Sequence, residues 1–232
     1  GDKIPRRFGA RLVPLPIDVQ VDTNASLEPL LDPVDAVHQV LQVDHLNAAQ
    51  DQVVDEGPHV AVGMHVHDAA RLERAADDIR KGTGATCLTL PLDIRRPDTP
   101  DQIRTLLAAH DLYADILVNS AGIGTTGEFQ SEAADDIDAV TDLNVTALTR
   151  LTRAFLPDML VRGHGGIINI ASLGGFLPGP YQAAYYATKA HVISLTRAIA
   201  WENRGRGVRI TTVAPGPVNT EFHARAHGET SL

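Results

Sequence analysis

The chain has 232 residues, a length that fits one large domain. Hydrophobic residues make up 44% and charged residues 21%, so a sizeable core is available and wholesale disorder is excluded. The single cysteine excludes a disulfide framework and a multi-cysteine metal site. The net charge of −9 disfavours a nucleic-acid or anionic-membrane partner. With no apolar run of membrane-spanning length and no signal peptide, we expect a cytoplasmic protein.

The first quarter of the chain has an unusual composition. Residues 12–70 contain ten acidic residues and no Lys or Arg, and no glycine occurs between Gly9 and Gly57. We therefore divide the chain into an atypical acidic N-terminal segment, 1–56, and a core, 57–232. Within the segment we expect a strand over 12–21 and a helix over 33–56, because Asp32-Pro33 can serve as its cap and first turn.

From Gly57 onward, aliphatic runs of strand length alternate with segments of helical periodicity. The predicted strands are 59–66, 85–92, 115–119, 166–171 and 208–214. The predicted helices are 68–81, 99–110, 132–162 and 184–203, the third broken near Pro157. This alternation predicts a Rossmann-like α/β fold: one domain of three layers around a doubly wound parallel sheet. Ligands of such sheets bind beyond the carboxyl ends of the strands.

Residues able to act on a substrate follow three of these strand ends. Asn119-Ser120-Ala121-Gly122 ends one strand, Ser172 follows another, and Pro215-Gly216 turns the chain after the last. On the helix between the last two strands, Tyr185 and Lys189 are four residues apart and therefore share a face. An ammonium near a phenol lowers the pKa of the phenol, so this Tyr could exchange a proton with a carbonyl or alcohol oxygen. An ordinary exposed Tyr beside the stem of a Lys is the alternative reading of this pair alone.

Together these motifs resemble the series found in the short-chain dehydrogenase/reductases. The elements are Asn119-Ser120-Ala121-Gly122, Asn144 within Leu143-Asn144-Val145, Ser172, Tyr185-x-x-x-Lys189, and Pro215-Gly216-x-Val218-x-Thr220. They occur in the family's order over about residues 57–222; the family usually has Asn where this chain has Ser120. The resemblance implies NAD(P)-dependent interconversion of a secondary alcohol and a ketone, of the 3-oxoacyl or similar carbonyl reductase type.

The resemblance also implies a role for each residue. Tyr185 would be the acid/base, Lys189 would lower its pKa and hold the nicotinamide ribose, Ser172 would orient the substrate oxygen, and Asn144 would hold a relay water. Asp93 and Ile94 would touch the adenine, while Asn119, Ala121 and Gly122 would border the adenosine half. The nicotinamide and phosphate side would be lined by Pro215, Gly216, Val218 and Thr220. The cofactor would be NAD or NADP, with no preference decided by His67, and no metal is expected near His59, His65 and His67.

Two family features are missing from the sequence. The glycine-rich turn T-G-x-x-x-G-x-G should lie near residues 36–45, where Val and Gln stand instead. The family also continues beyond the Thr220 position to a seventh strand, so we expect residues 57–232 to form a core truncated at its C-terminus, with strand 208–214 as a bare edge. Because a pyrophosphate needs backbone N–H groups at a helix start, we expect weak or absent NAD(P) binding. Either the first strand and helix have diverged, or the start belongs to another reading frame.

Two function classes therefore stay open. One is an active oxidoreductase acting on a small alcohol or carbonyl compound, and the other is an inactive relative with impaired cofactor binding. A module for a different nucleotide is weaker, because no other phosphate loop occurs in the sequence. For either class the resemblance implies a homodimer or homotetramer formed through the helices over 132–162 and 184–203. The substrate, the direction of reaction and the coenzyme preference are not decided by the sequence.

Overall fold

The computed structural model describes residues 39–45, 60–64, 69–83 and 86–216, all of which belong to the unit Pro33–Leu232. Its strands are β1 (Gln39–His45), β2 (Val60–Met64), β3 (Thr86–Thr89), β4 (Leu112–Asn119), β5 (Gly165–Ile170) and β6 (Val208–Val213). Its α-helices are α1 (Ala69–Thr83), α2 (Thr99–Ala109), α3 (Ala134–Thr141), α4 (Leu148–Arg162) and α5 (Ala183–Glu202). Three shorter helical turns are η1 (Phe129–Ser131), η2 (Asp142–Ala147) and η3 (Leu173–Phe176). Strands and helices alternate from β2 onward, as predicted.

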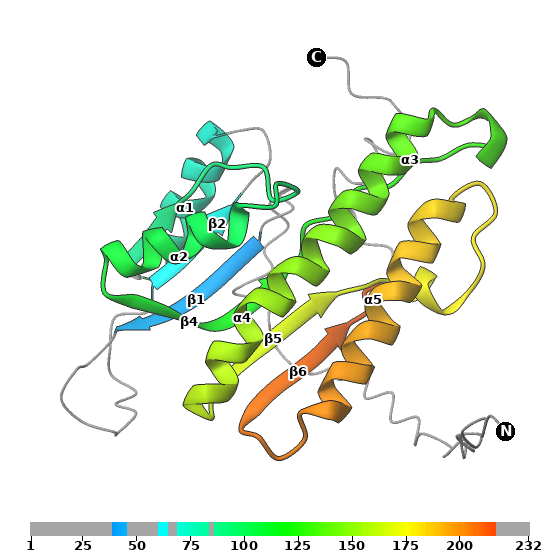
Figure 1. Cartoon of the computed structure of the whole chain (residues 1–232). Coiled ribbons are helices and arrows are strands. Elements are labelled where there is room, and N and C mark those ends of the chain that lie inside the picture. The colour runs from blue at the N-terminus through cyan, green and yellow to red at the C-terminus, as the bar shows by residue number, and fades with distance from the viewer. Residues whose placement is uncertain (1–38, 46–59, 65–68, 84–85, 217–232) are drawn as a thin grey trace, which may run out of the picture. The chain divides into compact units, whose positions relative to one another are not determined.

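The six strands form one sheet in the order β3-β2-β1-β4-β5-β6 (Figure 1). The pairs β2–β3, β4–β5 and β5–β6 are parallel. The chain order moves outward from the centre in both directions, which is the doubly wound Rossmann-like arrangement. Among the described residues β6 is an edge strand. The carboxyl ends of β4, β5 and β6 meet at one edge of the sheet.

The central strand β1 departs from the predicted structure. We expected a helix over residues 33–56, but Gln39–His45 are a strand that pairs antiparallel with both β2 and β4. A strand is favoured there because β2 and β4 each present backbone N–H and C=O groups that need a partner, and this tertiary demand overrides local helix preference. The predicted fold class, a doubly wound sheet of the Rossmann-like type, is confirmed, and β1 is the antiparallel exception within it. The predicted strand over 12–21 lies outside the described residues.

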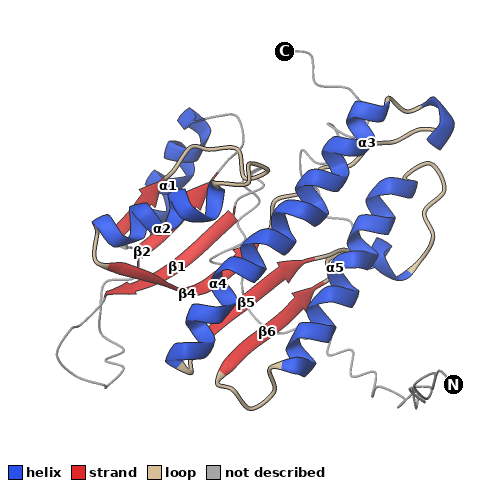
Figure 2. Ribbon diagram, in the orientation of Figure 1, coloured by secondary structure: helices blue, strands red, loops and turns tan. Residues whose placement is uncertain are grey.

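The predicted helix over 132–162 is interrupted, but not at Pro157. Pro157 lies inside α4, which continues to Arg162, while the irregular turn is η2, a π-helical segment. Pro157 and Arg153 are both exposed, so water can satisfy the Arg153 carbonyl that loses its helical partner to the proline. In Figure 2 the coil runs on from α3 through η2 to α4, so the π-helical segment changes the helix type without ending the helix.

The core lies between the sheet and the helices that contact it. Helices α2 and α4 pack against β4, α4 also against β5, and α5 against β5 and β6. The largest fully buried side chains include Ile103, Leu117, Leu151, Met159 and Ile167, which come from α2, β4, α4 and β5. In Figure 2 α4 crosses in front of the sheet, so this layer separates the β4–β5 pair from solvent. The described helices include none with the length and apolarity needed to cross a bilayer.

Candidate active site at the carboxyl ends of β4 and β5

Ser172, Tyr185 and Lys189 meet beyond the end of β5. Ser172 is the N-cap of η3, and its hydroxyl oxygen accepts a hydrogen bond of 3.1 Å from the Gly174 N–H. Tyr185 lies in the first turn of α5 and hydrogen-bonds to the Ser172 side chain. The Lys189 ammonium lies 5.7 Å from the centre of the Tyr185 ring and donates to the Ile170 carbonyl at 3.0 Å. The structure thus brings together the three residues that the sequence placed at a strand end and on one helix face.

The electrostatics of this trio differ from the prediction. Burial raises the pKa of Tyr185 above its usual value, and the hydrogen bond with Ser172 opposes part of that rise. The Lys189 ammonium does not bring the pKa of Tyr185 toward neutrality in this structure. Instead, burial lowers the pKa of Lys189 itself to about 8, because only 5% of this residue is exposed. Desolvation outweighs charge–phenol attraction at this separation.

Asn144 joins the site from η2. Its side-chain oxygen accepts from the Ile123 N–H at 2.9 Å, and its amide donates to the Ile123 carbonyl at 2.8 Å and to the Thr188 hydroxyl at 3.1 Å. Asn144 is therefore held between the loop after β4 and the α5 helix, next to the trio of Ser172, Tyr185 and Lys189. Thr188 was missed by the sequence analysis; its place between Tyr185 and Lys189 on α5 is the only signal that could have identified it.

Gly122 keeps the space between Asn144 and Lys189 open. A Cβ atom at this position would lie 3.3 Å from both the Asn144 oxygen and the Lys189 nitrogen. An ammonium beside such an opening is chemically suited to a ribose hydroxyl, so the described residues fit the nicotinamide-ribose half of NAD(P). The phosphate half is different, because β1 runs against its neighbours and begins, rather than ends, at this edge.

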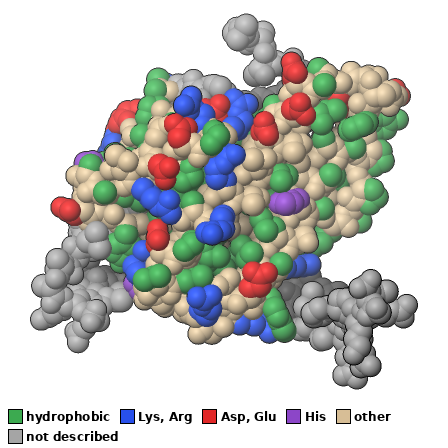
Figure 3. Space-filling view, viewed as in Figure 1, with side chains coloured by type: hydrophobic (Ala, Val, Ile, Leu, Met, Phe, Trp, Pro, Cys, Tyr) green, Lys and Arg blue, Asp and Glu red, His purple; other side chains and the backbone are tan. Residues whose placement is uncertain are grey.

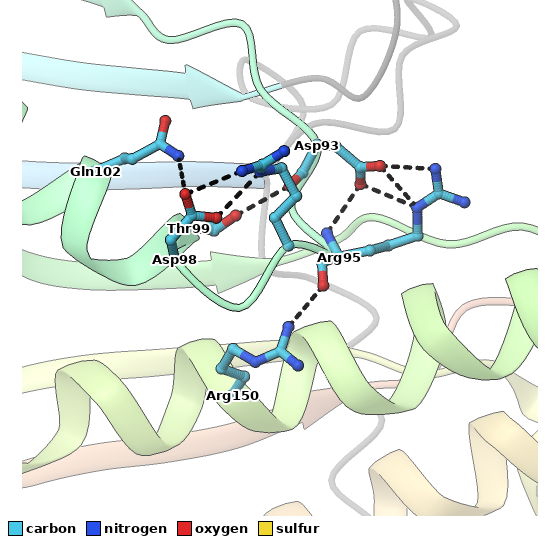
Figure 4. A network of polar contacts seen from close by, with 7 residues as sticks. Asp93, Arg95, Asp98, Thr99, Gln102 and Arg150 are labelled. Carbon is cyan, nitrogen blue, oxygen red and sulfur yellow. Dashed lines mark hydrogen bonds and ion pairs between the residues drawn. The ribbon is translucent and has the colours of Figure 1, made fainter.

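The residues predicted to contact adenine are engaged with the protein. Asp93 forms a two-pronged ion pair with the Arg95 guanidinium, with a shortest distance of 2.7 Å, and the Arg95 carbonyl accepts from Arg150 of α4 at 2.8 Å (Figure 4). Ile94 is 2% exposed and belongs to the core. Only the backbone of Ile94 and the outer surface of the Asp93–Arg95 pair can therefore meet a ligand.

Asn119 is part of a buried polar ladder. Its amide donates to the Asn169 side-chain oxygen at 2.7 Å and to the Thr152 hydroxyl at 3.0 Å, and Asn169 donates in turn to the Thr196 hydroxyl at 2.9 Å. Asn119 is only 1% exposed. That Asn119 borders the adenosine half of the cofactor stays a prediction. The ladder connects β4, β5, α4 and α5 and includes Asn169, which the sequence did not single out.

The remaining predicted site residues divide into two groups. Ala121 packs partly buried against the core beside Gly122, and the Pro215 carbonyl accepts from the Leu173 N–H at 3.0 Å, which brings the end of β6 next to Ser172. Val218 and Thr220 lie outside the described residues, as do His59, His65 and His67. In the described part of the chain no three His, Cys, Asp or Glu side chains gather in a way that could hold a metal ion. Cys87 is buried, and burial raises the pKa of its thiol.

Comparison with known proteins identifies the family. The family model described as short chain dehydrogenase matches residues 47–230. Oxidoreductase UcpA of Escherichia coli is 33% identical over 150 residues, which are 64% of this chain and 57% of UcpA. A short-chain dehydrogenase from Sphingobium yanoikuyae in complex with NADPH superposes with a TM-score of 0.66 at 33% identity, covering 73% of this chain and 65% of that one. An NAD+-bound xylitol dehydrogenase superposes with a TM-score of 0.60 at 26% identity, covering 64% and 57%.

The chain belongs to the short-chain dehydrogenase family, and its fold is that of the family's Rossmann-like domain. It spans a little over half the length of UcpA. Its solved neighbours include proteins with bound NADPH and with bound NAD+, which agrees with the expected cofactor without deciding between the two forms.

Proposed function

We propose that this chain acts in the cytoplasm as an NAD(P)-dependent oxidoreductase that interconverts a ketone and a secondary alcohol, in the manner of a carbonyl reductase. The observation that carries the proposal is the meeting of Ser172, Tyr185, Lys189 and Asn144 beyond the carboxyl ends of β4 and β5. The cofactor, when bound, supplies or accepts the hydride. The chain's own residues bind the reacting oxygen and move its proton.

The Tyr185–Ser172 pair suits a carbonyl oxygen. Both side chains carry hydroxyl groups, and the hydrogen bond between them supports the proposal that they share one substrate oxygen. Because burial raises the pKa of Tyr185, the phenol is protonated at neutral pH and can donate a proton to the oxygen that gains charge during reduction. Ser172 is held in place by the Gly174 N–H, which leaves its own O–H to donate.

Lys189 and Asn144 support this proton transfer. With a pKa of about 8, Lys189 is mainly an ammonium at neutral pH and stabilises the negative charge left on the phenol. The Asn144 side chain, fixed by Ile123 and Thr188, stands beside Lys189 across the space above Gly122. At this opening the Lys189 ammonium would hold the nicotinamide ribose.

We also propose that the enzyme is a homodimer or homotetramer assembled through α4 and α5. Small side chains favour close helix packing, and α5 exposes four alanines along its length. They are Ala183, Ala187, Ala190 and Ala198. Light scattering of the purified chain tests the assembly, and a single monomeric species at high concentration would contradict it.

The activity itself is tested by following NADPH and NADH oxidation at 340 nm with a panel of ketones. Wild-type chain should oxidise at least one of the two coenzymes in a ketone-dependent way, and Ser172→Ala should reduce that rate by about tenfold to a hundredfold. The control is Ser194→Ala, since Ser194 is an exposed serine on α5 away from the trio. Ketone-dependent turnover that survives Ser172→Ala unchanged would refute the assignment.

A further inference from the structure

The segment between the catalytic serine and the catalytic tyrosine exposes large apolar side chains. Of the seven large hydrophobic side chains exposed among the described residues, four lie within residues 173–181, which we name the lip. They are Leu173, Phe176, Leu177 and Tyr181, with exposed fractions between 45% and 68%. Exposing four such groups within nine residues is costly, because each could gain free energy by burial. A patch of this kind marks a place where something apolar binds.

The lip also lacks charge. No Asp, Glu, Lys or Arg occurs between Ser172 and Lys189. In Figure 3 charged side chains gather over the side of the molecule with α2 and α4, while the surface toward α5 and the segment before it is mainly hydrophobic and uncharged. The segment itself offers a charged or many-hydroxyl ligand no ionic partner. The charge that packs against it is the Arg197 guanidinium of α5, 5.5 Å from the centre of the Phe176 ring.

The lip is held in position at both ends. At one end, the Leu173 N–H donates to the Pro215 carbonyl at 3.0 Å, so Leu173 lies between the end of β6 and Ser172. At the other, the Tyr181 carbonyl accepts from the Gly127 N–H at 2.9 Å, and the neighbouring Gln182 side chain donates to the Thr126 hydroxyl at 3.1 Å. The lip therefore spans from the β6 loop to the loop that follows β4.

Tyr186 supports the middle of the lip. Its ring fills the space beside two glycines of the lip: a Cβ at Gly179 would lie 2.3 Å from the ring, and one at Gly174 would lie 3.1 Å from it. The ring also makes an edge contact with Tyr185, with 6.0 Å between ring centres. The backbone of the lip therefore packs against Tyr186, which is the neighbour of the proposed proton donor Tyr185.

We propose that the lip binds the apolar substituent of the ketone, so that the preferred substrates carry an aliphatic or aromatic group of several carbons rather than a hydroxylated or ionic chain. This inference rests on the proposed function, since it places the reacting carbonyl between Ser172 and Tyr185. The lip begins directly after Ser172 and ends four residues before Tyr185, so its exposed apolar side chains belong to the segment that joins these two hydroxyl groups.

The test compares 2-butanone, 2-hexanone, 2-octanone and 1,3-dihydroxyacetone as substrates for the full chain at one high coenzyme concentration. Each methylene buried against the lip should raise kcat/KM by about threefold to fourfold when fully buried. We expect kcat/KM to rise at least about tenfold from 2-butanone to 2-octanone, and dihydroxyacetone to be the poorest substrate. Leu177→Ser should lower kcat/KM for 2-octanone several-fold more than for 2-butanone. The control is Val161→Ser, which changes an even more exposed apolar residue on α4 and should leave both values unchanged.

The outcomes separate the lip from the proposed function. Reduction of short ketones with no gain from chain length overturns the lip and leaves the function standing. If no ketone is reduced, saturation-transfer NMR of 2-octanone decides: binding weakened by Leu177→Ser and not by Val161→Ser supports the lip, and binding insensitive to both overturns it. If Leu177→Ser instead converts a dimer into monomers in sedimentation and leaves the chain-length ratio unchanged, the lip is a contact between copies and the proposal is wrong.

Discussion

The two halves of the sheet carry different amounts of the family's machinery. The half made of β4, β5 and β6 is parallel throughout. Ser172 follows β5, Tyr185 and Lys189 lie on α5, which packs against β5 and β6, and Asn144 lies on η2, which packs against α5. The half made of β1, β2 and β3 contains the reversed strand β1, so the central strand delivers its carboxyl end to the opposite edge. A helix start that binds phosphate has to follow a strand end at the ligand edge.

The proton-transfer part and the phosphate-binding part of a dinucleotide enzyme thus depend on different structural features of the chain. The proton-transfer site needs short motifs at strand ends and one helix face, which survive as long as those strands keep their register. The phosphate site needs the direction of one particular strand. The catalytic half can therefore be intact in a molecule whose nucleotide half is altered, and the following experiments probe each half separately.

The largest expected effect is on the catalytic half. Tyr185→Phe removes the hydroxyl that donates the proton while keeping the ring that packs beside Tyr186, so activity should fall by about a hundredfold or more with the fold unchanged. The measurement is kcat/KM for ketone reduction, with circular dichroism as the check on folding. Tyr186→Phe is the matched control, because the Tyr186 contribution to the lip comes from its ring; a Tyr185→Phe enzyme with wild-type turnover would break the assignment of the donor.

The next effect concerns the nucleotide half. With β1 reversed and no glycine between Gly9 and Gly57, we expect NADPH to bind about a hundredfold more weakly than at a site with two charge-assisted phosphate bonds. Calorimetry should give a dissociation constant for NADPH well above about 10 µM, because the lost phosphate bonds weaken binding by about a hundredfold. A constant of a few micromolar would show that other residues replace the missing cradle and would remove the contrast between the two halves.

A smaller effect is expected from the polar ladder that joins β4 to β5. Asn119→Ala leaves the Asn169 oxygen and the Thr152 hydroxyl buried without the donor, and should lower the free energy of unfolding by about 2–3 kcal/mol. Urea denaturation measures this change. The comparison is Asn203→Ala, near the end of α5. This amide donates to the Ile199 carbonyl and accepts from Arg206, and its removal should lower the free energy of unfolding by less. Equal losses would mean that the ladder has no special weight.

The smallest effect is a pH dependence set by Lys189. Its pKa in the folded chain, about 8, is below the ordinary value of 10.5, so the ammonium loses its proton as pH rises through 8. Ketone reduction should decline along that limb, whereas Tyr185, with a raised pKa, stays protonated. Between pH 8 and 10.5 the unfolded chain holds a proton that the folded chain has lost, so stability should rise with pH over the same window. Thermal unfolding of wild type and Lys189→Met checks the second part; a rise that persists in Lys189→Met would assign it elsewhere.

Most of the fold from β2 onward was predictable from residue pattern. Strands such as β5 are β-branched-rich runs that begin at glycine, and α1 buries Leu72 and Ala76, which are four residues apart as the helical period requires. The reversal of β1 was not predictable, because strand direction is decided by pairing with β2 and β4, and no local residue encodes it. The position of the break before α4 was also missed, since a π-turn has no residue as conspicuous as Pro157.

The site was predictable where chemistry and spacing coincide and unpredictable where burial decides. Tyr185, Lys189 and Ser172 were found from a helical period and a strand end. The structural use of Asn119 was not visible, because it depends on Asn169 lying opposite in the sheet, 50 residues away. The altered pKa of Lys189 likewise follows from desolvation by neighbours that only the folded chain provides.

The pairing of Asn119 with Asn169 acts as a check on folding accuracy. Along β4 and β5 the apolar residues would tolerate a slip of two residues, because such a shift returns each side chain to the same face. The slipped sheet would place each asparagine opposite an apolar neighbour and break the buried Asn119–Asn169 hydrogen bond, a penalty that disfavours the error. A slip of that size would carry Ser172 about 7 Å along the strand axis. The same two amides that reject a misregistered sheet thereby determine where the reactive oxygen can be held.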